Sequence, residues 1–258
     1  MSIKKNIPNF ITLLNLFSGS IAVIFAVQGN LVLAALFVAL GIFFDFFDGL
    51  AARALNVKSE LGLQLDSLAD MVTSGLVPGI VMFQLLMRAI PNSEPTTEIE
   101  WSLGNNWLSW DFSTWAIVGL LVTLASAYRL AKFNIDDRQT DSFIGLPTPA
   151  NALLILSLPL ILHFNPDPDL VRIILNQWFL LGLVIFSCIV LNAEIPLFAL
   201  KFKTWGFKEN KIRYLFILYA FVLMIIFQYV AIPLVIFSYV IISLLYRRHL
   251  IQEKVEAS

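Results

Sequence analysis

Four aspartates lie within residues 45–70 of a chain that is otherwise poor in charge. Asp45 and Asp48 are three residues apart, Asp66 and Asp70 are four apart, and apolar sequence flanks both pairs. These spacings place each pair on one face of a helix. Carboxylates that meet from two helices repel one another unless cations neutralise them, and hard oxygen ligands favour Mg²⁺ or Mn²⁺. Because paired metal ions clamp phosphate oxygens, the stretch predicts metal-assisted chemistry on a phosphate.

The residues between the aspartates suit a diphosphate ligand. Gly49, Ala52 and Gly62 are small where a ligand would approach the backbone, and Arg53 offers a planar fork for a phosphate or a base. The alternative is a helical hairpin in which the aspartates pair with Arg53 and Lys58. Two cations would then have to satisfy four buried anions, which disfavours that interpretation.

The composition indicates a membrane as the setting of this site. The chain has 258 residues, of which 59% are hydrophobic and 14% charged, against about 45–50% and about 25% in soluble domains. A soluble protein of this composition would expose large apolar patches. The net charge of −1 argues against a nucleic-acid partner. A single cysteine, Cys188, excludes an internal disulfide.

The apolar runs predict an all-α, polytopic integral membrane protein that forms one domain over residues 1–258. A helix needs about 20 apolar residues to cross a bilayer. Eight transmembrane helices are expected, or six if the fifth or the last pair is interfacial. They cover about residues 10–28, 31–50, 61–90, 113–133, 149–164, 176–196, 213–229 and 231–246.

The distribution of positive charge predicts the orientation. With the N-terminus inside, the cytoplasmic segments collect every one of the 17 lysines and arginines except Arg88 and Arg172. The longest outer loop, around residues 91–113, has four acidic residues and no basic one. We therefore expect a multi-pass protein of the cell (inner) membrane with both termini in the cytoplasm.

The depth of the aspartates follows from this topology. A carboxylate that faces lipid at the bilayer centre costs about 2.5–3.5 kcal/mol, so these side chains should face a polar site instead. Asp45 and Asp48 lie near the end of the second span, and Asp66 and Asp70 near the start of the third. The four are expected to meet in the cytoplasmic half of the membrane, in an active site that faces the cytoplasm.

The order Asp48-Gly49-x2-Ala52-Arg53-x8-Gly62-x3-Asp66-x3-Asp70, preceded by Asp45, resembles the complete signature of the CDP-alcohol phosphotransferase family. The resemblance implies a membrane enzyme that transfers a phosphatidyl-type group from a CDP-linked donor to an alcohol and releases CMP. It implies that Asp70 is the general base and that the enzyme is a homodimer. It also implies that two divalent ions, Mg²⁺ or Mn²⁺, are held by Asp45, Asp48, Asp66 and Asp70, and that the nucleotide pocket is lined by Gly49, Ala52 and Arg53.

Other stretches resemble the bacterial and archaeal members of the family that use serine. They are "IPNFITLLNLFSG", "ASAYRLAKFNID" and "FIGLPTPANA". The resemblance implies CDP-diacylglycerol as donor, L-serine as acceptor, and phosphatidylserine and CMP as products. The chain departs from the pattern at Asn151, Ala193, Glu194 and Ala199, and the likeness fades in the last two spans.

Further polar residues are candidates for substrate contacts. Arg129 and Lys132, three residues apart at the cytoplasmic end of the fourth span, suit the capture of an anionic acceptor group; the alternative is anchoring at the membrane surface. Asn9, Thr12 and Asn15 near the N-terminus suit contacts with the nucleotide or with the metal-site carboxylates. Their alternative role is capping and interhelical hydrogen bonding. Gly62 is expected to lie against the CDP-linked donor.

Two other functions compete with this interpretation. The first keeps the donor but uses glycerol 3-phosphate or inositol phosphate as acceptor, which should require more cations around the pocket. The second is a divalent-cation transporter, which would need acidic residues across the whole depth of the bilayer. All four aspartates fall in one half, which favours the enzyme.

Overall fold

The computed structural model describes residues 6–57, 59–89, 112–135, 143–197, 206 and 210–256. The described chain is helical, which confirms the predicted all-α class. Extended backbone among these residues is a two-residue antiparallel ladder that pairs Phe143 with Leu197 and Ile144 with Pro196. Lys58 and the predicted outer loop at 91–111 lie outside the described residues.

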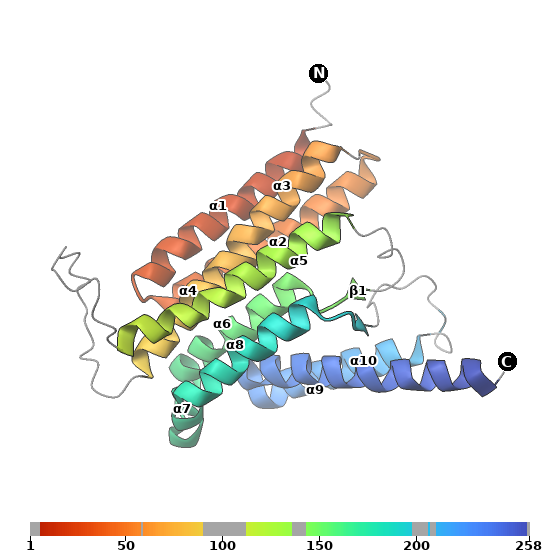
Figure 1. The fold of residues 1–258 in the computed structure, drawn as a ribbon. Coiled ribbons are helices and arrows are strands. Elements are labelled where there is room, and N and C mark those ends of the chain that lie inside the picture. The colour runs from red at the N-terminus through yellow and green to blue at the C-terminus, as the bar shows by residue number, and fades with distance from the viewer. Residues whose placement is uncertain are drawn as a thin grey trace.

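Helices from the first half of the chain run side by side, and those from the second half pack below them (Figure 1). The first half comprises α1 (Ile7–Val27), α2 (Leu31–Ala54), α3 (Glu60–Asp70), the π-helix η2 (Met71–Leu76), α4 (Val77–Arg88), the 3₁₀-helix η3 (Phe112–Leu120) and α5 (Leu121–Ile135). The second half comprises β1 (Phe143–Ile144), α6 (Thr148–Phe164), α7 (Pro168–Ile174), α8 (Gln177–Asn192), β2 (Pro196–Leu197), α9 (Lys211–Phe227), η4 (Gln228–Val230) and α10 (Ala231–Glu256).

The turn between α2 and α3 brings the two aspartate pairs toward each other. Asn56 closes α2 in the left-handed region, with φ of 52°, and the Val57 N–H donates to the Ala52 carbonyl over 2.9 Å. This is the hydrogen-bond pattern of a Schellman ending. The Ser59 hydroxyl then accepts from the Gly62 N–H over 3.0 Å and caps the start of α3. Local chemistry thus ends one helix and begins the next within a few residues.

Among the described residues, five helical segments are long and apolar enough to cross a membrane, or up to six if the bent pair α7 and α8 forms one span. One of the five is the run Arg213–Leu245. The axes of that pair differ by 59°, and α6 is a shorter apolar helix. The protein is therefore a multi-pass helical membrane protein. The count of eight crossings and the cytoplasmic placement of both termini stay predictions.

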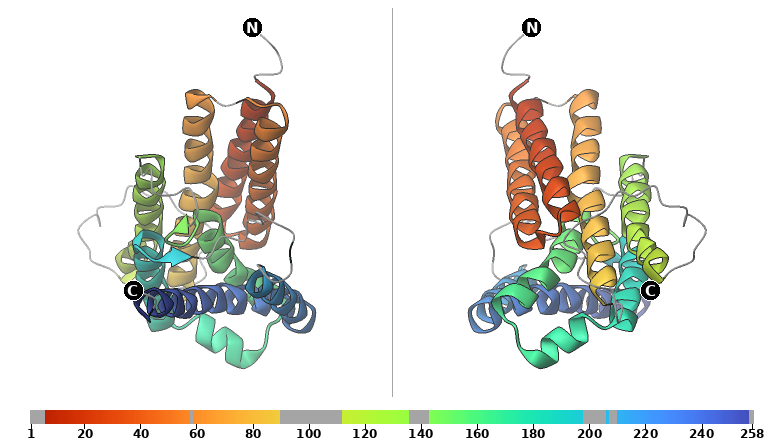
Figure 2. Two further views of the ribbon diagram at one scale, coloured as in Figure 1. Left: turned by 90° about the vertical axis from the view of Figure 1, so that its right-hand side faces the viewer. Right: turned by 90° about the vertical axis from the view of Figure 1, so that its left-hand side faces the viewer.

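The last apolar run, Arg213–Leu245, is folded back on itself. The hydroxyl oxygens of Tyr219 and Ser238 lie 2.9 Å apart, whereas 19 residues of straight helix would span about 28 Å. Gln228, with φ of 49°, stands at the reversal. The run is a hairpin of α9 and α10, as its division into two segments from the sequence predicts, and the hairpin lies across the other helices (Figures 1 and 2).

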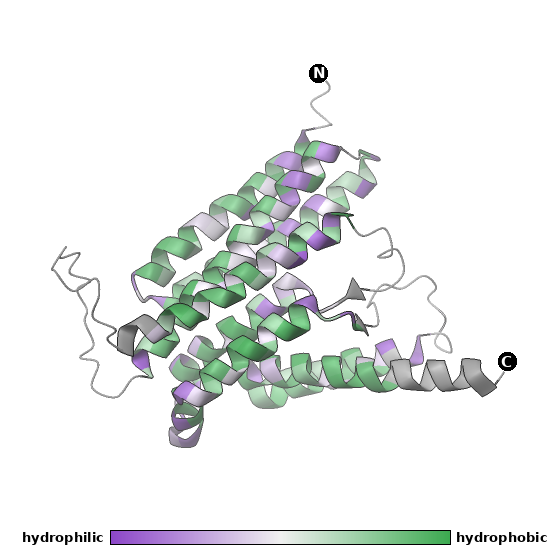
Figure 3. Ribbon diagram, viewed as in Figure 1, coloured by the Kyte–Doolittle hydropathy of each residue, from purple (hydrophilic) through white to green (hydrophobic). Residues whose placement is uncertain are grey.

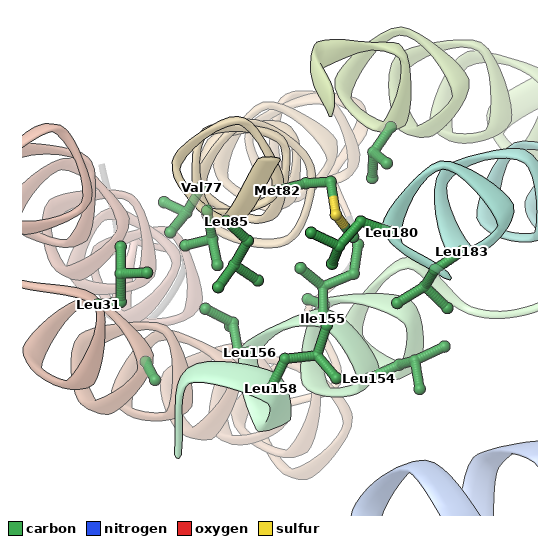
Figure 4. Packing of buried hydrophobic residues seen from close by; sticks show 14 of the residues in the cluster. Leu31, Val77, Met82, Leu85, Leu154, Ile155, Leu156, Leu158, Leu180 and Leu183 are labelled. Atoms are coloured by element: carbon green, nitrogen blue, oxygen red, sulfur yellow. The ribbon is translucent and has the colours of Figure 1, made fainter. Parts of the chain in front are cut away.

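Helix α4 lies at the centre of the hydrophobic core. Val77, Met82 and Leu85 are fully buried, and they pack among leucine and isoleucine side chains of α6 and α8 (Figure 4). The 3₁₀-helix η3 packs closely on α4, since a Cβ on Gly119 would lie 2.6 Å from the Phe83 nitrogen. Polar residues gather instead at the end of the bundle where α2 ends and α3 begins (Figure 3).

Candidate functional site

Three of the four aspartates meet at one point. Carboxylate oxygens of Asp45, Asp48 and Asp66 lie within 4.8 Å of one another, and Asp48 is only 7% exposed. Asp70, one turn further along α3, is close enough to interact electrostatically with Asp48 and Asp66. Carboxylates crowded in this way, and partly removed from water, fit a hard divalent cation such as Mg²⁺ or Mn²⁺.

Helix α1 connects the two aspartate-bearing helices. It packs along both α2 and α3. The Thr12 hydroxyl lies 2.6 Å from Asp48 Oδ2 on α2, and the Asn15 amide nitrogen lies 3.4 Å from Asp70 Oδ1 on α3. Because Thr12 and Asn15 are three residues apart, one face of α1 reaches an aspartate from each neighbour. Contacts of Thr12 and Asn15 with the metal-site carboxylates are one of the alternatives drawn from the sequence, and the structure shows both contacts.

The two glycines of the motif have different surroundings. A Cβ on Gly49 would have one heavy atom within 4 Å, Nη2 of Arg53 at 3.9 Å, so protein packing does not require glycine there. A Cβ on Gly62 would lie 2.9 Å from Ser59 Oγ and 3.0 Å from Asn9 Oδ1. Close packing of α1 on α3 therefore accounts for Gly62, whereas the space beside Gly49 is open.

Arg53 lies over the open space at Gly49. Its Nε donates to the Gly49 carbonyl over 2.9 Å, and the side chain is otherwise exposed. Ala52, next to it, is half-buried. This bond orients the guanidinium and leaves its terminal nitrogens available to a ligand at the end of α2.

Arg129 and Lys132 are directed to different places. Arg129 is 7% exposed, interacts electrostatically with Asp70, and has a buried Nε that finds no hydrogen-bond partner in the described part of the chain. The Lys132 ammonium forms an ion pair with Glu194, 3.2 Å away, and the Glu194 side chain is 63% exposed. The predicted pair of acceptor-binding cations thus separates into a buried arginine beside the aspartates and a surface lysine in an ion pair.

A comparison with protein families identifies the chain. The family model described as CDP-alcohol phosphatidyltransferase matches residues 5–189. The chain belongs to this family. The matched residues begin before α1 and end within α8, so they contain the four aspartates and the polar residues of α1, α2 and α5 described above.

Curated relatives within the CDP-alcohol phosphatidyltransferase family resemble most of the chain. A CDP-diacylglycerol–serine O-phosphatidyltransferase of Bacillus subtilis is 34% identical over 167 residues, which cover 65% of this chain and 80% of the relative. One of Helicobacter pylori is 28% identical over 225 residues, covering 85% of the chain and 81% of the relative. One of Methanocaldococcus jannaschii is 30% identical over 157 residues, covering 60% and 62%.

Sequence reasoning missed several polar residues that the structure buries, one in η2 beside the site and two in α6. Thr73 in η2 is fully buried and donates to Asn15. Thr148 and Asn151, on one face of the first turn of α6, are 1% and 0% exposed, and their side-chain oxygens have no hydrogen-bond partner among the described residues. For these three residues the sequence offers one signal, the departure from the family pattern at Asn151.

Substitution of Arg53 tests its role in donor binding. Arg53→Lys is expected to weaken the affinity for a CDP-lipid about tenfold, because an ammonium cannot form the paired hydrogen bonds of a guanidinium. The measurement is the dissociation constant of CDP-diacylglycerol in detergent. Arg172→Lys, at an exposed arginine of α7, is the matched control. An unchanged affinity in Arg53→Lys would remove Arg53 from the donor site.

Proposed function

We propose that this enzyme transfers the phosphatidyl group of CDP-diacylglycerol to the hydroxyl of L-serine, giving phosphatidylserine and CMP. The convergence of Asp45, Asp48 and Asp66 carries the proposal, since it supplies a cation site fit for a diphosphate. The names of the relatives from Bacillus subtilis and Helicobacter pylori support the donor and the acceptor.

Two divalent ions, Mg²⁺ or Mn²⁺, complete the site in this proposal. Asp45, Asp48 and Asp66 would hold them, together with Asp70, and the crowding of these carboxylates supports that assignment. When bound, the ions neutralise charge on the donor's diphosphate and on the departing CMP. Thr12 fixes the orientation of the Asp48 carboxylate through its 2.6 Å hydrogen bond.

Asp70 acts as the general base. It accepts the proton of the serine hydroxyl while the hydroxyl oxygen forms a bond to the phosphorus that carries the diacylglycerol. The bond from that phosphorus to the bridging oxygen breaks, and CMP leaves with the electron pair. Arg53 and the open space at Gly49 support placement of the nucleotide at the end of α2.

Arg129 receives the carboxylate of serine. Its burial, its proximity to Asp70 and the unpartnered Nε support this role, because a buried guanidinium gains most from a charged, hydrogen-bonding partner. Helix α6 packs against both α5 and η2. The unpartnered side chains of Thr148 and Asn151 on α6 therefore supply hydrogen-bonding groups for the rest of a small zwitterion.

Two substitutions on α5 separate acceptor binding from surface charge. Arg129→Gln is expected to raise the KM for serine at least tenfold and to leave the KM for CDP-diacylglycerol nearly unchanged, because it removes a charge-assisted hydrogen bond. Lys132→Gln also removes one positive charge from α5, but the interaction lost is an exposed ion pair. The KM of this variant for serine should therefore stay within about twofold of the wild-type value. Equal effects of the two would contradict the assignment to Arg129.

The setting of the reaction belongs to the same proposal. We place the enzyme in the cell (inner) membrane, with the aspartates in the cytoplasmic half, so that acyl chains stay in lipid while CMP leaves into water. A homodimer is proposed from the family resemblance.

The proposed acceptor is tested by competition. The purified enzyme would receive CDP-diacylglycerol, Mn²⁺ and an equal mixture of L-serine, glycerol 3-phosphate and inositol phosphate, and the lipid products would be identified by mass spectrometry. Phosphatidylserine is the expected product. A lipid with a second phosphate as main product, from glycerol 3-phosphate or inositol phosphate, would replace serine by that acceptor. Absence of any lipid product, together with Mn²⁺ uptake into vesicles that contain the protein, would indicate a transporter.

A further inference from the structure

The amide of Asn15 is held at both ends. Its Nδ2 lies 3.4 Å from Asp70 Oδ1, and its Oδ1 accepts a hydrogen bond from the Thr73 hydroxyl over 2.8 Å. Asn15 and Thr73 are both fully buried. Because an ionised carboxylate only accepts hydrogen bonds, the NH₂ end must face Asp70 and the carbonyl end must face Thr73. The Asp70 carboxylate therefore sets which way the amide points, and the Thr73 hydroxyl, which donates to the amide oxygen, holds its other end.

Two glycines confine Thr73. A Cβ on Gly19 of α1 would collide with the Thr73 hydroxyl. A Cβ on Gly41 of α2 would lie 2.6 Å from Thr73 Cγ2 and 2.8 Å from Asn15 Oδ1. Such close packing leaves the threonine side chain little freedom to rotate. Steric packing therefore holds the Thr73 hydroxyl in place in addition to its hydrogen bond.

The helix geometry changes immediately after Asp70. Helix α3 ends at Asp70, and the next six residues, Met71–Leu76, form the π-helix η2 that carries Thr73. A π-helical turn inside a longer helix is uncommon and often accompanies a functional site. Here it lies between the aspartate and the threonine, and Asn15 contacts both.

We propose that Asn15, held in place by Thr73, is a positioning residue for Asp70. The amide holds Oδ1 of the carboxylate, so that Oδ2 faces the acceptor hydroxyl whose proton it takes. This inference rests on the proposed role of Asp70 as general base. Substitution of a residue that hydrogen-bonds to a reacting group in this way typically lowers activity about 10- to 100-fold.

A pair of matched threonines tests the proposal. Thr73→Val is expected to lower kcat about 10- to 100-fold, with little change in the KM for either substrate or in Mn²⁺ affinity. Thr123→Val is the control. Thr123 lies against a glycine in the same way, since a Cβ on Gly79 would collide with its hydroxyl, and it donates to the Gly75 carbonyl of η2 over 3.2 Å. Thr123 has no hydrogen bond to Asn15 or Asp70, so the kcat of Thr123→Val should stay near that of the wild type.

Rescue and direct truncation complete the experiment. Thr73→Ser keeps the hydroxyl and should restore most of the lost kcat, while Asn15→Leu, similar in size but unable to donate, should lose at least as much as Thr73→Val. If Thr73→Val does not fold, Thr73→Ala removes the same hydroxyl without adding a methyl group. Folding is checked for every variant by its affinity for CDP-diacylglycerol and for Mn²⁺.

The possible outcomes separate this inference from the proposed function. Equal losses in Thr73→Val and Thr123→Val, or a wild-type kcat in Asn15→Leu, would overturn the positioning role while serine transfer by the wild type still stood. Failure of the proposed function would appear differently, as absence of phosphatidylserine from the wild type. Substantial activity in Asp70→Asn would remove the base that Asn15 is proposed to position.

Discussion

Asp70→Asn is expected to abolish turnover while leaving the binding of Mn²⁺ and of CDP-diacylglycerol largely intact. Asp70 lies outside the group of three converging carboxylates, so its charge should matter less for cation affinity than that of Asp48. The amide has nearly the shape of the carboxylate and keeps one oxygen that can ligate a cation, but it cannot take a proton at neutral pH. Loss of a general base lowers rates by about 10²- to 10⁴-fold. The effect should appear in kcat, measured as phosphatidylserine formed per enzyme, because the proton is transferred in the chemical step and not in binding.

A matched substitution shows whether the loss is specific. Asp169→Asn makes the same chemical change at an exposed carboxylate in the first turn of α7, and it should leave kcat unchanged. Donor affinity must be measured on Asp70→Asn itself, since a variant that no longer binds CDP-diacylglycerol would have lost the site and not the base. A near-normal rate of product formation would show that another group accepts the proton.

Most of the site could be predicted because the aspartates leave few alternatives. Four carboxylates in an apolar chain must face one another or a cation, and their spacing assigns them to faces of two helices. The convergence of Asp45, Asp48 and Asp66 within 4.8 Å agrees with that expectation. The helical class follows equally directly from the apolar runs, since backbone groups in lipid must be hydrogen-bonded within the segment.

What could not be predicted depends on contacts between distant segments. Thr73 and Asn15 are 58 residues apart, and nothing in their local sequence indicates that they share a hydrogen bond. The ion pair of Lys132 with Glu194 depends on how the end of α8 packs beside α5. Gly62 illustrates a second limit: a glycine inside a motif suggests space for a ligand, and only the structure shows Asn9 packed against it.

Asp48→Asn is expected to raise the Mn²⁺ concentration required for activity about 10- to 100-fold. Asp48 is the most buried of the three converging carboxylates, at 7% exposure, and it accepts the Thr12 hydrogen bond. The substitution removes one negative charge from the group that would hold the cations, and cation affinity follows the number of charged ligands. Mn²⁺ binding, followed by electron paramagnetic resonance, and activity over a Mn²⁺ titration measure the effect independently.

The pattern of rescue distinguishes a ligand from a base. Chelation of the wild type should abolish activity, and added Mn²⁺ should restore it. Excess Mn²⁺ should likewise recover much of the activity of Asp48→Asn, because occupancy lost through weaker binding returns at higher concentration. It should not recover Asp70→Asn, whose missing proton acceptor no cation concentration can replace. If Asp48→Asn binds Mn²⁺ as tightly as the wild type, Asp48 is not a metal ligand, and the crowded carboxylates at the end of α2 would require a different explanation.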